Sequence, residues 1–149
     1  MLTNVLIGLV LPGILTLYLF KQNPKIIILM YPLGIAIAFT SNDWGSGLYW
    51  TVSPVYEKNG SLSAFPYNVG YFPFIASLFG YLNIKNLINS HWLILLFSIT
   101  FTSLELMAVF LDKISYHNGW NIFFTFFVYL VGYTGAHLYM IILKKYKVL

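Results

Sequence analysis

The sequence predicts an all-α integral membrane bundle of about five transmembrane helices, in a single domain that covers residues 1–149. First, 59% of the residues are hydrophobic and only 8% are charged, whereas a soluble domain carries about 25% charged residues. So few charges cannot cover a surface that faces water. Second, the chain divides into five apolar stretches, each close to the roughly 20 residues that a membrane helix needs. Third, the lysines lie at the ends of these stretches.

The first two spans are predicted at residues 2–20 and 26–44. Pro12 lies near the middle of the first span, and Pro32 lies within the second. Each is expected to kink its helix, because proline removes one helix hydrogen bond. The apolar part of the second span is short for a crossing, so tilting, thinning of the bilayer or extension of the helix to Trp44 is expected.

The loop at residues 45–63 is the longest connection and is predicted to lie on the outer side of the membrane. It carries Tyr49, Trp50 and Tyr56 among Gly, Ser and Pro residues. Such rings favour the headgroup level of a bilayer. We therefore expect the loop to lie on the membrane surface or to fold back onto the helix ends. Capping a cavity is a further alternative.

The remaining spans are predicted at residues 64–82, 91–111 and 120–143. The first of these is the least regular, because Pro66 and Pro73 interrupt its first half and delay the start of a helix. The other two are long apolar stretches without proline and give the clearest predictions.

The lysines predict an orientation, because short cytoplasmic loops of membrane proteins carry an excess of positive charge. With five spans, six lysines fall on one side: Lys21, Lys25, Lys85, Lys144, Lys145 and Lys147. The other side holds only Lys58 and Lys113. The N-terminus is therefore expected outside and the C-terminus in the cytoplasm. The absence of arginine, with abundant Ile, Asn and Lys, suggests an AT-rich bacterial genome and hence a bacterial cell membrane.

Glu105 is the one acidic residue that lies well inside a predicted span, since Asp43 is at the end of its span. A charge at that depth costs at least about 2.5–3.5 kcal/mol on insertion scales, so the side chain is expected to avoid lipid. Residues on the same helix stripe share its direction, and these are Ser98, Thr102 and Asp112. The stripe is expected to face the bundle interior, where hydroxyl groups can hydrogen-bond the carboxyl group.

Two interpretations of Glu105 stay open. It is either a hydrogen-bonded residue that holds helices together, or a proton or cation site or a site for a polar ligand. Intramembrane hydrogen bonds average only about 0.6 kcal/mol, whereas an acid in a span is by default a functional hypothesis.

His137 is a second candidate polar residue. Tyr129, Tyr133 and His137 are spaced by four and share a helix face. This row is either a proton relay, since imidazole titrates near neutrality, or an aromatic row with a satisfied histidine, which we favour. Direct contact with Glu105 is not expected, because the two residues lie in opposite halves of antiparallel spans. Gly132 and Ala136 form a small-xxx-small pattern, for which we favour internal packing over dimerisation.

The loop between the last two spans contains a further polar cluster: Asp112, Tyr116, His117, Trp120 and Asn121. Asn118-Gly119 predicts a turn, Trp120 is a natural anchor at the membrane interface, and Asn121 is expected to open the next helix. Two loosely spaced ligands, Asp112 and His117, are too few to predict a metal site.

The segment YHNGWN, residues 116–121, resembles an uncharacterised family of small multi-pass membrane proteins from spore-forming Firmicutes. These proteins carry a Tyr-x-x-Gly-Trp-Asn motif between their last two spans, a Glu in the span before it and an earlier Phe-Pro segment. The matching residues here are Tyr116, Gly119, Trp120 and Asn121, with Glu105 and Phe65-Pro66. The resemblance covers about the second half of the chain and implies a multi-pass membrane protein without a known activity.

Three functions are compatible with these features. The first, which we favour, is a non-enzymatic accessory or structural subunit that assembles with a larger membrane partner or with copies of itself. The second is a small proton- or cation-linked transporter or channel that uses Glu105. The third is a membrane enzyme acting on lipid or isoprenoid. The chain has no cysteine and no recognisable nucleotide, pyrophosphate or nucleophile motif, and no basic face for nucleic acid. We expect no cofactor.

Overall fold

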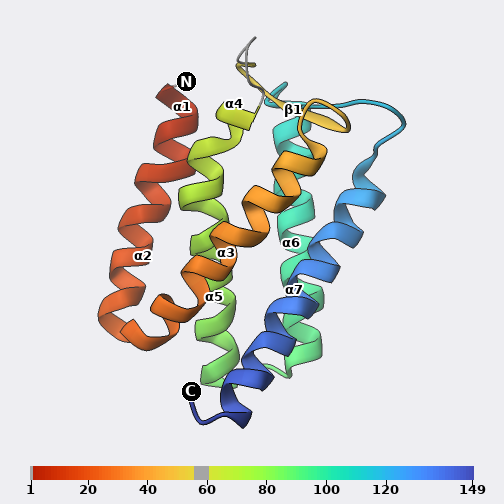
Figure 1. Cartoon of the computed structure of the whole chain (residues 1–149). Helices are drawn as coiled ribbons and strands as arrows, with labels where there is room; N and C mark the ends of the chain where they lie inside the picture. Colours follow the sequence, from red (N-terminus) through yellow and green to blue (C-terminus); the bar gives the residue numbers. More distant parts are fainter. Residues whose placement is uncertain (1, 56–60) are drawn as a thin grey trace.

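The computed structural model describes residues 2–55 and 61–149, whose helices run up and down in one bundle (Figure 1). The elements are α1 (Leu2–Val5), the π-helical turn η1 (Leu6–Val10), α2 (Leu11–Gln22), α3 (Pro24–Gly45), β1 (Trp50–Val52), α4 (Ser61–Pro66), the π-helical turn η2 (Tyr67–Tyr71), α5 (Phe72–Lys85), α6 (Ser90–Phe110), β2 (Ile114–Tyr116) and α7 (Ile122–Lys145). Four helices are long and apolar enough to cross a membrane: Leu2–Gln22, Pro24–Gly45, Ser90–Phe110 and Ile122–Lys145. The protein is thus the all-α membrane bundle that the sequence predicts.

The helix Ser61–Lys85 coincides with the remaining predicted span but is less apolar than the other four. Its position explains this difference. α5 lies between the pair α2 and α3 and the pair α6 and α7 (Figure 1). It buries Ser77 and Asn83, and the turn η2 before it buries Asn68. A helix that is covered by protein on several sides does not need an apolar face toward lipid. The prediction that helix formation is delayed here is wrong, because the helix begins at Ser61.

At two of the prolines that were expected to disturb a helix, the structure has a π-helical turn just before the proline. η1 ends just before Pro12, and η2 ends just before Pro73. A proline ring displaces the carbonyl four residues earlier, and for Pro73 this carbonyl belongs to Val69. Val69 O accepts a hydrogen bond from the hydroxyl of Tyr31 on α3 instead. Pro32 lies inside α3, which continues as one helix to Gly45.

Glycines allow the two π-helical turns and the helices beside them to approach closely. A Cβ on Gly70 would come within 2.2 Å of the Gly8 carbonyl oxygen, and one on Gly34 within 2.6 Å of Pro73 Cα. Neither gap holds a methyl group. Gly132 on α7, by contrast, has no atom within 4 Å of a Cβ. The small-xxx-small pattern at Gly132 and Ala136 therefore does not serve internal packing at the glycine, contrary to the prediction, although Ala136 is buried.

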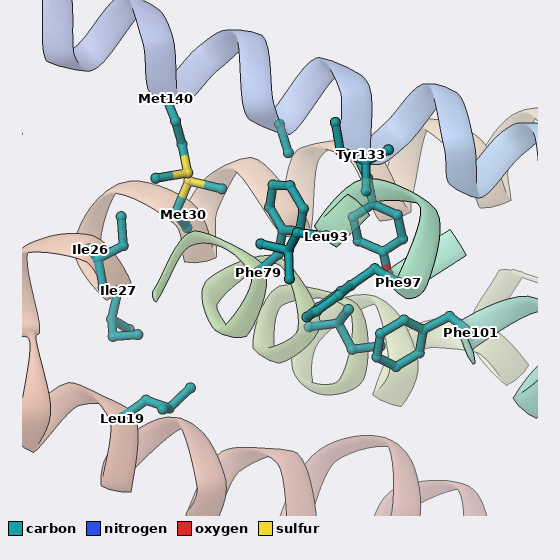
Figure 2. Close-up of a cluster of buried hydrophobic side chains, with 13 residues drawn as sticks. Leu19, Ile26, Ile27, Met30, Phe79, Leu93, Phe97, Phe101, Tyr133 and Met140 are labelled. Atoms are coloured by element: carbon teal, nitrogen blue, oxygen red, sulfur yellow. The ribbon is translucent and has the colours of Figure 1, made fainter. Parts of the chain in front are cut away.

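The apolar core lies where α5 meets α6 and α7 (Figure 2). The ring of Phe79 is fully buried, and its centroid is 5.4 Å from that of Phe97 and 5.3 Å from that of Tyr133. The Phe79–Phe97 pair is edge-to-face, with an angle of 77° between the ring planes, and such pairs add to the energy of burial. Toward the C-terminal end of α5, Ile26 and Met30 from α3 and Met140 from α7 belong to the same core.

The bundle has two different ends. β1 and β2 form a small antiparallel sheet across one of them, the sheet end, with Trp50 opposite Tyr116. The other, which we call the lysine end, holds the connections Gln22–Pro24 and Lys85–Ser90 and the end of α7 (Figure 1). The six lysines that the sequence assigns to one side all belong to this end. Lys113 belongs to the sheet end, while Tyr56, Glu57 and Lys58 lie outside the described residues.

Candidate functional site

Glu105 lies on α6 near the sheet end and is partly buried against α7 and β2. Three hydroxyl groups donate hydrogen bonds to its carboxyl group. Tyr116 OH lies 2.7 Å and Thr125 Oγ1 3.1 Å from Oε1, and Tyr129 OH lies 3.0 Å from Oε2. The donors come from β2 and from the first two turns of α7. Glu105 therefore links three elements at one point.

A second layer of contacts holds these donors in place. Trp120 Nε1 donates to Thr125 Oγ1 at 3.0 Å, and the hydroxyls of Tyr116 and Thr125 lie 3.0 Å apart. Burial, and after it the nearby Glu105 carboxylate, raise the pKa of Tyr116 above that of a free phenol. Tyr116 consequently keeps its proton and stays a donor. All three hydroxyls donate to the carboxyl oxygens here, although a hydroxyl group can also accept from a protonated carboxylic acid.

The segment YHNGWN builds this network through its local structure. Tyr116 ends β2, and Asn118 and Gly119 follow in the left-handed region, with φ of 50° and 76°. This turn brings Trp120 back over Thr125. Asn121 then caps α7, since its Oδ1 accepts a hydrogen bond from Phe123 N at 3.0 Å. The predicted turn and the predicted helix start at Asn121 are both present.

The two hydroxyl residues expected to bind Glu105 do not do so. Ser98 and Thr102 are buried, as predicted for the inward stripe. Ser98 Oγ, however, donates to Ile94 O in its own helix, and Thr102 Oγ1 has no hydrogen-bond partner among the described residues. Asp112 leaves the stripe because α6 ends at Phe110, and its side chain is exposed.

Thr125 is the member of the site that the sequence reasoning missed. It lies four residues before Tyr129, so it extends the row Tyr129, Tyr133 and His137 by one helical turn. A buried hydroxyl in line with that row was the available signal. The three residues of the row lie in three different surroundings. Tyr129 reaches Glu105, Tyr133 stacks on Tyr129 at 6.2 Å and enters the aromatic core, and His137 lies near the lysine end.

His137 is separate from Glu105, as expected. Its Nδ1 lies 3.3 Å from Asn83 Nδ2, and its ring centroid lies 6.3 Å from that of His91. His117 belongs to the sheet end, where Nε2 lies 3.0 Å from Thr51 Oγ1 across the strand pair. Within residues 2–55 and 61–149, no three His, Cys, Asp or Glu side chains are grouped as metal ligands would be.

A second polar network ties β1 to the helices beside it. Trp50 Nε1 donates to Asn42 Oδ1 at 3.0 Å, and Asn42 Nδ2 donates to Asn68 Oδ1. Asn4 Nδ2 donates to Ser53 O at 3.0 Å. All three asparagines are buried. The described part of the loop thus folds back onto the helix ends, one of the two expected arrangements.

Aromatic rings join the two loops of the sheet end. The Trp120 ring centroid lies 4.9 Å from that of Tyr49, 5.1 Å from that of Trp50 and 5.4 Å from that of Phe124. Trp44 completes the group at 5.1 Å from Tyr49 and is 60% exposed. The role of Trp120 as an interfacial anchor stays a prediction.

No family model, curated protein or solved structure matches the chain. The resemblance carried by the YHNGWN segment therefore stays a prediction, and the function has to be argued from the molecule itself.

Proposed function

We propose that this chain is a non-enzymatic accessory or structural subunit of a bacterial cell membrane, with its N-terminus outside. One observation carries the proposal. The intramembrane acid, the feature most suggestive of activity, is engaged by three hydroxyls of its own chain and joins α6, β2 and α7. Glu105 then helps to hold the sheet end in its fold. Because the connections of the bundle are short, we infer that the chain acts in assembly.

The lysine distribution supports the orientation. Lys21, Lys25, Lys85 and the three lysines of the C-terminal segment belong to one end, which the positive-inside rule assigns to the cytoplasm. The sheet end, with its tryptophans, then lies at the outer surface.

A second function has a specific observation in its favour. The three hydroxyls around Glu105 can all donate to a carboxylate anion, and the described residues place no lysine or histidine beside it. A proton or a small cation is the natural counter-ion for such a group, so the runner-up is a small proton- or cation-linked transporter or channel.

Reconstitution into liposomes separates the two proposals. We expect wild-type proteoliposomes to show the same proton and sodium flux as empty liposomes, with a pH-sensitive dye inside as the readout for protons and a sodium-sensitive dye as the readout for sodium. We also expect native extraction to yield the chain in a complex of fixed stoichiometry, larger than the purified chain. A flux above background that Glu105→Gln abolishes and Ser103→Ala preserves would replace the accessory role with transport. Ser103 is a matched control, because its exposed hydroxyl bonds to Ile99 O in its own helix and to no other side chain or backbone group in residues 2–55 and 61–149.

A further inference from the structure

A groove lies between α6 and α7 toward the lysine end. Its volume is about 450 Å³, within the range of about 300–1,000 Å³ typical of small-molecule sites. The walls are largely apolar and consist of Ile94, Leu95, Leu130, Leu138 and Ile141. His91 and His137 line it as well, one from each helix. The groove is therefore amphipathic along its length.

The two histidines are arranged as donors. Asn83 Nδ2 lies 3.3 Å from His137 Nδ1, and because an amide nitrogen only donates, Nδ1 accepts. The proton of a neutral His137 is then on Nε2. No side chain in the described ranges bonds to that Nε2 or to either ring nitrogen of His91. Two imidazoles with 6.3 Å between their centroids thus offer N–H groups from both walls.

A positive charge lies near the histidines and has no acidic partner among the described residues. Lys144 interacts electrostatically with His137. His91 lies in the first turn of the 21-residue helix α6, which carries no acidic residue in that turn, and the positive end of the helix dipole favours an anion there. The described acidic side chains belong to the sheet-end half of the molecule: Asp43, Glu105 and Asp112. A negatively charged ligand would balance this charge.

We propose that the groove binds one acidic phospholipid, with its phosphate between His91 and His137 and an acyl chain along the apolar walls. Its position favours a lipid over a soluble anion, because the groove opens between two membrane helices whose neighbouring side chains, Trp92 and Leu96, are exposed. Trp92 next to His91 marks the headgroup level. Basic residues lie near the helix ends, and apolar residues lie deeper in the span. This order matches the headgroup and the acyl chains of a phospholipid. The site does not depend on the role proposed for Glu105.

Native mass spectrometry of the detergent-solubilised chain tests this inference. The probe is an equimolar mixture of dioleoyl phosphatidylglycerol and dioleoyl phosphatidylcholine. We expect the wild type to retain one phosphatidylglycerol, at least fivefold in excess over phosphatidylcholine. The double variant His91→Ala with His137→Ala should lose that preference, whereas His117→Ala, which removes the remaining histidine at the sheet end, should keep it.

Two further measurements separate the contribution of the lipid headgroup to binding from that of the acyl chain. Leu95→Trp narrows the groove and leaves both histidines, so retention of both lipids should fall. Soluble glycerol phosphate should not displace the bound lipid at a tenfold excess. An absent preference in the wild type, an unchanged preference in the double variant or displacement by glycerol phosphate would each overturn the proposal. The wild-type preference for phosphatidylglycerol is measured without any substitution. The proposal can therefore still be overturned when a variant fails to fold.

Discussion

At the sheet end the polar side chains bind one another, whereas at the lysine end the charged side chains face outward. Glu105, Tyr116, Thr125 and Tyr129 form one closed network, and Asn42, Asn68 and Trp50 form another. The lysine end has basic residues, two histidines and an open groove. At the sheet end the described polar groups thus bond mostly within the fold, whereas the histidines of the other end line an open groove and its lysines are exposed.

The largest effect is expected from Glu105→Leu, which breaks the closed network. Leucine suits an apolar helix but leaves three hydroxyls without their acceptor. With three intramembrane hydrogen bonds at about 0.6 kcal/mol each, the free energy of unfolding should fall by about 2 kcal/mol. Thermal unfolding in mild detergent measures this.

Ser103→Leu is the control, since Ser103 is exposed on the same helix, and it should leave stability unchanged. A Glu105→Leu variant that is as stable as the wild type, or more so, would contradict a structural role. The acid would then be kept at a cost that folding does not require, which indicates function.

A smaller effect is expected from Tyr116→Phe. The ring stays in β2, and only the hydroxyl that contacts Glu105 and Thr125 is lost. The expected loss is about 1 kcal/mol, typical of one hydrogen-bonding group, measured in the same unfolding assay. Tyr146→Phe at the lysine end provides the matched comparison, because Tyr146 is 71% exposed. Equal losses in the two variants would erase the contrast between the ends.

No stability change is expected from the variants that place the two ends relative to the membrane. The chain has no cysteine, so single cysteines report without background. A membrane-impermeant maleimide should label Ser115→Cys in intact cells and Lys147→Cys only after permeabilisation. Both side chains are exposed. The reverse pattern would invert the orientation proposed from the lysines.

The helices were predictable because each follows from a local pattern. Apolar stretches predict α3, α6 and α7, and Asn121 caps its helix where the sequence places the start. The inward direction of Glu105 also follows from the cost of a charge in lipid. All of these arguments use residues close together in the chain.

The partners of Glu105 were harder to predict, because they depend on tertiary structure. Ser98 and Thr102 share its helix face, but a helical serine or threonine readily bonds to the carbonyl four residues earlier, as Ser98 does. Tyr116 reaches the acid only because β2 turns back over α6. The helix Ser61–Lys85 shows the same limit, since its modest hydropathy reflects a central position that no local pattern reveals.

The strand pair also constrains how the protein is made. Thr51 and His117, which meet across the sheet, are 66 residues apart in the chain. A ribosome therefore delivers β1 long before β2 exists, and the helices Ser61–Lys85 and α6 are made in between. During that interval the backbone groups of β1 that pair with β2 lack that partner, while Trp50 O can still accept from Gly47 N. The sheet end is consequently among the last parts of the molecule to be completed during synthesis.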